Sequence, residues 1–197
     1  MSPMRLLCLL ALLVCVSSFL WGMSGAYFRR VGRLGRGFRA IQAGGALALA
    51  CNVAALLRHD PIGWAPGMAA LGLYVLSLAA FWWAVASHAR QPPSHAFSAD
   101  LPEALVRHGP YRLVRHPFYA SYLLTWSAAF VATQAWPLLL PLALMSAIYV
   151  RAAHQEERKF EASPLAGHYA EYRARTGMFL PRWRPKRSPA TACGEQS

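Results

Sequence analysis

From residue 116 to residue 150 the chain reads HPFYASYLLTWSAAFVATQAWPLLLPLALMSAIYV, without a single Asp, Glu, Lys or Arg. A bilayer core about 30 Å thick is crossed by about 20 apolar helical residues, each rising about 1.5 Å. Gln134 interrupts this stretch, and Pro137 then falls where the first turn of a helix tolerates proline. We therefore expect a helical hairpin in the membrane, with arms at about Phe118 to Thr133 and Ala135 to Val150.

The rest of the chain repeats this charge-free pattern. Further apolar spans are expected at Leu6 to Tyr27, Ala40 to Leu57 and Trp64 to Ser87. The chain is 56% hydrophobic and only 14% charged, against about 25% charged residues in soluble domains. We predict an all-α polytopic membrane protein with about five spans and a polar C-terminal tail. A soluble all-helical core, and a cleaved signal peptide in place of the first span, are the alternatives.

The Arg and Lys residues are concentrated in the regions between and after the apolar spans. The net charge is +12, and the regions 29–39, 88–117 and 151–197 hold 5, 4 and 9 of the 20 Arg and Lys residues. Arg5 and Arg58 account for the other two. Cytoplasmic loops of membrane proteins are enriched in Lys and Arg, so this pattern places all three basic regions, and the C-terminus, in the cytoplasm. It explains the charge better than nucleic-acid binding does.

One domain accounts for the length. We expect a single transmembrane domain over residues 1–186, with its catalytic part at about 85–183, and a disordered tail over 187–197. Cys8, Cys15 and Cys51 lie in apolar spans and Cys193 in the tail, without the spacing of a disulfide framework or a zinc site. No metal is expected.

The first candidate site lies where the hairpin begins. The segment from Gly109 to Tyr119 reads GPYRLVRHPFY. Arg112 and Arg115 can hold a carboxylate or phosphate through forked hydrogen bonds, and Tyr111 and Tyr119 can pack on a flat ring or on a cation. The alternative is a basic connector that contacts lipid headgroups.

The second candidate site lies where the hairpin ends. Glu156 and Glu157 can bind hydroxyl or amino groups, or they can be exposed partners of nearby arginines. The two polar clusters would meet on one side of the membrane. Farther on, Tyr169 and Tyr172 share one helical face and form either a lid over the site or part of a helix on the membrane surface.

Taken together, these motifs resemble the isoprenylcysteine carboxyl methyltransferase and phospholipid methyltransferase superfamily. The resemblance rests on GPYRxxRHPxY, the paired glutamates, Tyr-x-x-Tyr and a late proline, and it covers about residues 85 to 183. It implies S-adenosyl-L-methionine as cofactor, bound at the cytosolic side by the last two spans and the tail. The family often has glycine where this chain has Ser121.

The resemblance also implies roles for particular residues. It places these in the cofactor site: Leu105, Val106, His108, Gly109, Tyr111, His116, Pro117, Phe118, Tyr119, Glu156 and Glu157. It leaves Arg112, Arg115, Arg151 and His116 as candidates for catalysis, either by holding a substrate carboxylate or by taking the proton of an amine. The substrate would be a prenylcysteine-like carboxylate or a phospholipid amine that enters from the bilayer. An NADPH-dependent sterol or isoprenoid reductase, and a non-enzymatic protein that retains the fold, are the alternatives.

Overall fold

The chain is described here by a computed structural model that covers residues 2–22, 36–58, 61–88 and 104–182. Over these residues it forms helices and turns and no strand. The helices are α1 Pro3–Trp21, α2 Arg36–Arg58, α3 Trp64–Ser87, α4 Pro117–Thr133, α5 Leu139–Glu161 and α6 Ala166–Arg175, with 3-10 turns at Gly109–Arg112 and Trp136–Leu138.

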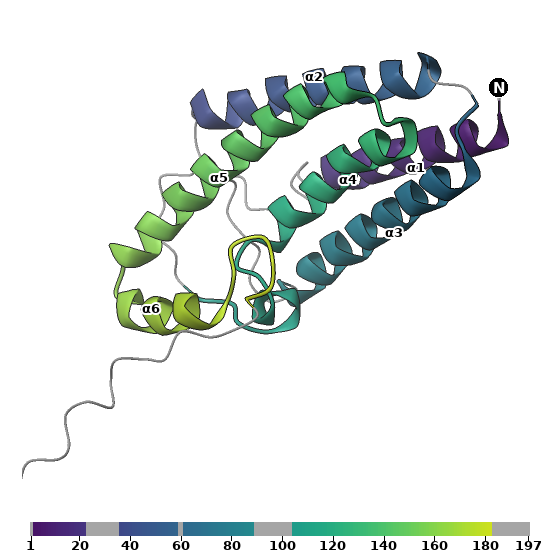
Figure 1. Ribbon diagram of the computed structural model, residues 1–197. Helices are drawn as coiled ribbons and strands as arrows, with labels where there is room; N and C mark the ends of the chain where they lie inside the picture. The colour runs from purple at the N-terminus through teal and green to yellow at the C-terminus, as the bar shows by residue number, and fades with distance from the viewer. Residues whose placement is uncertain (1, 23–35, 59–60, 89–103, 183–197) are drawn as a thin grey trace, which may run out of the picture.

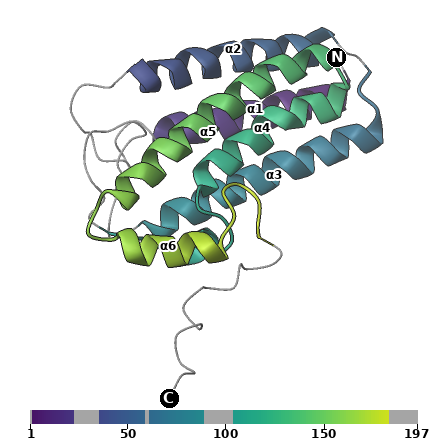
Figure 2. The ribbon, with the colours of Figure 1, turned by 60° about the vertical axis from the view of Figure 1, so that its left-hand side comes forward.

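The helices α1 to α5 run side by side in one bundle (Figure 1). The short helix α6 lies across the end of the bundle at which α5 finishes and α4 begins, and the N-terminus lies at the opposite end (Figures 1 and 2). The α4–α5 hairpin expected from the sequence is present, and it turns through Gln134, which has the left-handed φ of 52°.

Among the described residues, four helices are long and apolar enough to cross a membrane: α1, α2, α3 and α5. In each of them only 28–33% of the apolar window is buried inside the bundle. The remaining apolar surface is too large for a water-soluble helix, so it fits the hydrocarbon of a bilayer. Helix α4 has 17 residues, about 26 Å at 1.5 Å per residue, and its packing on α3 is the most extensive in the bundle.

Some expected helix boundaries were wrong. Helix α5 begins only at Leu139, after a 3-10 turn that contains Pro137, and it continues past Val150 to Glu161. Apolarity ends at Val150, but the residues that follow are good helix formers without glycine or proline. Helix α2 likewise begins at Arg36, before the expected Ala40, so part of the basic first loop is helical. Residues 23–27 of the first expected span lie outside the described residues.

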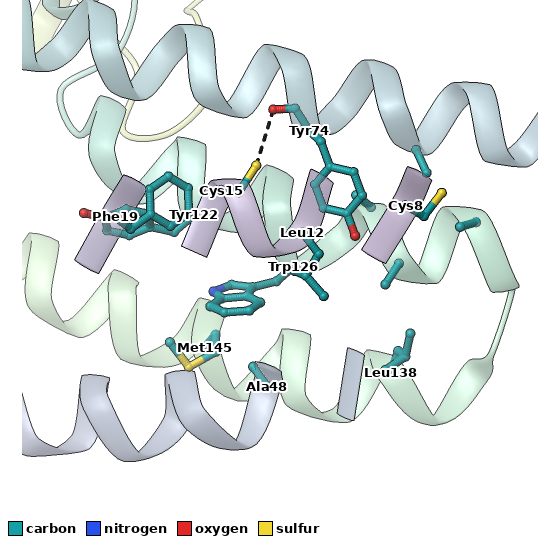
Figure 3. Packing of buried hydrophobic residues seen from close by; sticks show 14 of the residues in the cluster. Cys8, Leu12, Cys15, Phe19, Ala48, Tyr74, Tyr122, Trp126, Leu138 and Met145 are labelled. Carbon is teal, nitrogen blue, oxygen red and sulfur yellow. Dashed lines mark hydrogen bonds between the residues drawn. The ribbon is translucent and has the colours of Figure 1, made fainter. Parts of the chain in front are cut away.

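The core of the bundle joins aromatic and small side chains. The ring of Phe19 in α1 lies 4.9 Å from that of Phe81 in α3 and 4.7 Å from that of Tyr122 in α4. Figure 3 shows the contact of Phe19 with Tyr122. On the α3–α4 contact, the hydroxyl of Ser77 donates to the carbonyl of Ser121 over 2.6 Å. The side chain of Ser121 is itself fully buried, so its small size suits this close contact between α3 and α4.

Candidate functional site

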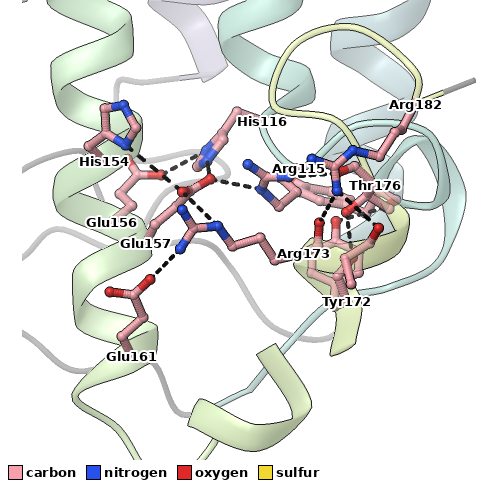
Figure 4. A network of polar contacts seen from close by, with 12 residues as sticks. Arg115, His116, His154, Glu156, Glu157, Glu161, Tyr172, Arg173, Thr176 and Arg182 are labelled. Carbon is pink, nitrogen blue, oxygen red and sulfur yellow. Dashed lines mark hydrogen bonds and ion pairs between the residues drawn. The ribbon is translucent and has the colours of Figure 1, made fainter. Parts of the chain in front are cut away.

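The two polar clusters meet at the end of the bundle covered by α6, as the sequence predicted. His116 is the residue that joins them. Its Nδ1 lies 3.4 Å from Oε2 of Glu156, and its Nε2 lies 3.2 Å from Oε1 of Glu157. Pro117 disfavours helical backbone at the residue before it, and His116 has φ −126° and ψ 67° as the N-cap of α4. The imidazole thus lies between two carboxylates (Figure 4).

This position sets the charge of His116. Burial alone lowers the pKa of an imidazole, because it disfavours the charged form. Here the hydrogen bonds and negative charges of Glu156 and Glu157 outweigh burial, and the pKa of His116 is raised above its ordinary value of 6.5. The two carboxylates therefore favour the protonated, positively charged form of His116.

The guanidinium of Arg115 is bound by other groups of the protein. Its Nε donates to Oε1 of Glu157 over 2.8 Å, and its Nη1 donates to the carbonyl of Thr176 over 2.5 Å. Its side chain is only 7% exposed. Arg115 therefore holds Glu157 and the segment after α6 in place. Its expected role in holding a substrate carboxylate stays a prediction.

An aromatic wall continues from the site toward the apolar part of the bundle. The hydroxyl of Tyr119 donates to Oε1 of Glu156 over 2.5 Å. The ring of Tyr119 stacks on that of Tyr149 at 5.2 Å and 15°, and the indole of Trp126 donates to the hydroxyl of Tyr149 over 3.2 Å. These contacts form a continuous series from the carboxylate of Glu156 through Tyr119 and Tyr149 to Trp126, so the polar site borders directly on aromatic side chains of the hairpin.

The turn at Gly109 brings the connection onto the end of α3. Gly109 has a φ of +60°, and a Cβ there would lie 2.1 Å from the hydroxyl oxygen of Ser87, so no other residue fits. Two residues later, the hydroxyl of Tyr111 hydrogen-bonds Nε2 of His88 over 2.8 Å. Tyr172 of α6 donates its hydroxyl to the carbonyl of Tyr111 over 2.7 Å.

The Tyr-x-x-Tyr pair faces the bundle. Tyr169 and Tyr172 are 3% and 7% exposed, and the ring of Tyr169 stacks on Phe160 of α5 at 4.9 Å. Burial raises the pKa of Tyr172 to about 12, so this phenol stays protonated as a donor. The sequence allows two roles for the pair, a lid over the site or part of a helix on the membrane surface. The burial of both tyrosines against the bundle agrees with the lid.

The segment that follows α6 closes the site. We call residues 176–182 the C-terminal strap. Its backbone runs parallel to Val114 and accepts hydrogen bonds from the amides of Arg115 and His116, at the carbonyls of Gly177 and Met178. The strap places the ring of Phe179 edge-on to His116 at 6.1 Å. The late proline of the sequence motif, Pro181, lies in this strap, but the position of the strap depends on its backbone pairing with Val114, which the sequence alone does not show.

The other expected site residues lie at varying depth. Leu105 and Val106 are half-buried beside the Gly109 turn, and Pro117 is fully buried. Phe118 stacks near His88 at 6.2 Å. His108, Arg112 and Arg151 are exposed, and no contact joins them to the acid pair. Within the described ranges no group of three His, Cys, Asp or Glu side chains could hold a metal ion, and the expectation of no metal stays a prediction.

Comparison with known proteins gives the class of this molecule. Residues 67–166 match the phospholipid methyltransferase family, which is half of the 197-residue chain. The chain therefore belongs to this family of membrane methyltransferases, within the superfamily that the motifs indicated. Such enzymes generally use S-adenosylmethionine. With its apolar helices, the chain is an integral membrane protein.

One curated relative extends the comparison. Over 78 residues the chain is 38% identical to the cobalt-zinc-cadmium resistance protein CzcN of Cupriavidus metallidurans. The similarity covers 40% of this chain and 36% of that protein. The chain thus spans little more than a third of the length of this relative.

Proposed function

We propose that this protein transfers a methyl group from S-adenosylmethionine to a lipidic or prenylated substrate at the cytosolic membrane face. The acceptor is the carboxylate of a prenylcysteine-like group or the amine of a phospholipid. The observation that carries the proposal is the position of His116 between Glu156 and Glu157. It joins the start and the end of an apolar hairpin in one polar site.

The residues of the site fit a cationic nucleotide cofactor. Oε2 of Glu157 and the hydroxyl of Tyr169 are buried and have no hydrogen-bond partner among the described residues. Buried polar atoms are nearly always paired, so these two are suited to a ligand. The ring of Tyr119 and the acid pair favour a positive charge near them, whereas the demethylated product carries no such charge on sulfur.

When bound, S-adenosylmethionine supplies a methyl group that the sulfonium has already activated. The protein then has to align the acceptor, the methyl carbon and the sulfur, and to exclude water. We assign exclusion of water to the strap and α6, through Phe179 and Tyr172. We assign alignment to Tyr119, since its hydroxyl is fixed on Glu156 and its ring on Tyr149.

The chemical nature of the group that accepts the methyl determines which further residues take part in the reaction. An amine acceptor has to lose a proton, and Glu156 is suited to take it, because its side chain is 32% exposed while that of Glu157 is 3% exposed. The carboxylates favour the protonated form of His116, and in that form the imidazole has no free lone pair with which to take the proton. A carboxylate acceptor needs a free arginine instead, and Arg112 and Arg151 remain available for that role.

Ligand binding tests the proposal directly. Purified protein in detergent should bind S-adenosylmethionine and not NADPH, which a reductase of similar architecture would bind. Lipid extracts incubated with the protein and a labelled methyl donor, then separated by class, would identify the acceptor. Labelled phospholipid would assign the amine, and a labelled base-labile methyl ester would assign the carboxylate. Binding of NADPH alone would overturn the proposal.

The membrane face requires its own experiment. The exposed position Glu171 on α6 can carry the substitution Glu171→Cys in a chain whose native cysteines are replaced by serine. A cytosolic site predicts that a membrane-impermeant maleimide labels this cysteine only after the membrane has been opened. Labelling of intact cells would place the site on the other side.

A further inference from the structure

Three side chains beside the acid pair surround Oε2 of Glu157, which has no hydrogen-bond partner among the described residues. Nε of Arg173 lies 3.9 Å from Oε2 of Glu157, and Nδ1 of His154 lies 4.0 Å from it. Both distances are too long for hydrogen bonds. The hydroxyl of Tyr169 adjoins the same carboxylate and interacts with its charge, but in the part of the chain that the structure describes it has no partner within hydrogen-bond geometry. Oε1, by contrast, is bound by Arg115 and His116.

The side chains of Glu157, Arg173 and Tyr169 place one hydrogen-bond acceptor next to several hydrogen-bond donors. Glu157 offers one buried carboxylate oxygen that can accept a hydrogen bond from an ammonium group. Arg173 uses Nη1 to bind Glu161, and its guanidinium has five N–H donors in all, so it can also bind a carboxylate. The phenol of Tyr169 adds a further donor.

An acceptor for an ammonium beside donors for a carboxylate matches the zwitterion of an α-amino acid. We propose that Arg173 and Tyr169, together with Oε2 of Glu157, bind the amino-acid end of the methyl donor. Oε2 of Glu157 accepts from its ammonium, and Arg173 and Tyr169 donate to its carboxylate. This inference rests on the proposed function. It gives Tyr169 a binding role in addition to its position over the site, and it adds Arg173 to the residues that bind the methyl donor.

The place of this group in the fold favours a water-soluble ligand. The side chains of Arg173 and His154 are 46% and 50% exposed, so the group opens to water beside α6. The aromatic wall of Tyr119 and Tyr149 lies on the side of His116 that faces the hairpin, where a lipid would arrive. A phospholipid headgroup also combines an ammonium with an anion, and the experiment has to separate these two ligands.

Decarboxylated S-adenosylmethionine is the decisive probe, since it keeps the ammonium and the sulfonium and lacks the carboxylate. Its affinity and that of S-adenosylmethionine are measured by calorimetry on the full chain in detergent. The wild-type protein should bind S-adenosylmethionine roughly tenfold to a hundredfold more tightly, as expected for hydrogen bonds to a charged group. Arg173→Gln should abolish this preference by weakening S-adenosylmethionine binding alone. Arg175→Gln, which removes another arginine from α6, should retain it.

The variant Tyr169→Phe separates a binding role from a structural one. It removes a buried hydroxyl without a partner, so the ligand-free protein should melt at a higher temperature. If the hydroxyl binds the carboxylate, the affinity for S-adenosylmethionine should fall several-fold at the same time. A higher melting temperature with unchanged affinity would contradict the proposed role of Tyr169.

Three other results would overturn the inference. Equal weakening of both ligands by Arg173→Gln would mean that Arg173 does not recognise the carboxylate, although the proposed function would stand. Binding of O-phosphoethanolamine that depends on Arg173, with S-adenosylmethionine binding that does not, would assign the group to a lipid headgroup. Failure of the wild-type protein to bind either adenosyl ligand would remove the proposed function as well.

Discussion

Nε of Arg115 lies 2.8 Å from Oε1 of Glu157, across 42 residues of sequence. The first residue belongs to the connection before α4 and the second to the last turns of α5. Both side chains are nearly fully buried, and the same arginine binds the carbonyl of Thr176. One ion pair therefore ties both ends of the hairpin to the strap that closes the site.

Removal of this arginine should destabilise the protein severely. Arg115→Met keeps much of the volume and leaves Glu157 buried without its main partner, a change that costs about 3–5 kcal/mol in buried pairs. Chemical denaturation in detergent measures the loss. The double variant Arg115→Met with Glu157→Gln should lose less than the sum of the two single variants. Full additivity would show that the two residues do not act as a pair.

An exposed ion pair provides the control. Glu161 also binds an arginine, Arg173, but both side chains are about half exposed. Exposed pairs contribute about 0–1 kcal/mol, so Glu161→Gln should leave stability almost unchanged. A loss as large as that of Arg115→Met would mean that burial does not decide the strength of these pairs.

The substitution Gly109→Ala should displace the turn that carries Tyr111. Left-handed backbone costs a residue with a side chain roughly 1–2 kcal/mol, and the new methyl group would also overlap Ser87. We expect a lower melting temperature and weaker S-adenosylmethionine binding. Gly72→Ala is the matched control: its Cβ meets nothing within 4 Å, and alanine is the better helix former. If both variants behave alike, the turn does not require glycine.

The stability of the protein should depend on pH through His116. Its pKa is raised in the folded state, so its charge stabilises the fold fully below its unfolded value near 6.5, and this contribution is lost as pH rises through the folded pKa. The melting temperature should therefore fall over that window, and His116→Gln should remove this part of the dependence. His168→Gln, which removes an exposed histidine of α6, should leave the profile unchanged. An unchanged profile in His116→Gln would refute the assignment.

The strap should control catalysis more than folding. In Gly177→Ala the new Cβ would lie 1.7 Å from the carbonyl oxygen of Leu180, so the strap has to shift and move Phe179 away from His116. Misplacement of a site by about 1 Å can cost roughly 100-fold in rate. We expect a large fall in methyl transfer with a small change in melting temperature. Gly167→Ala, where the Cβ meets nothing within 4 Å, should keep full activity.

Much of this site could be predicted from the sequence. The absence of charge from His116 to Val150 predicted the hairpin, and a hairpin returns its two ends to one side. The contact of His116 with Glu156 and Glu157 follows from that geometry. Other features depend on tertiary contacts: nothing local to Arg115 shows that the strap folds back to it. Likewise, the spacing of Tyr169 and Tyr172 gave a shared face but not what that face covers.

One measurement tests the proposed lipidic substrate together with the methyl-transfer chemistry. Purified protein is reconstituted into liposomes made from a total lipid extract, and S-adenosylmethionine with a labelled methyl group is added. We predict that label appears in one organic-soluble lipid class, and that Gly177→Ala reduces it strongly while Gly167→Ala does not. Tight binding of the methyl donor without transfer to any lipid or prenylated acceptor would contradict the proposed function.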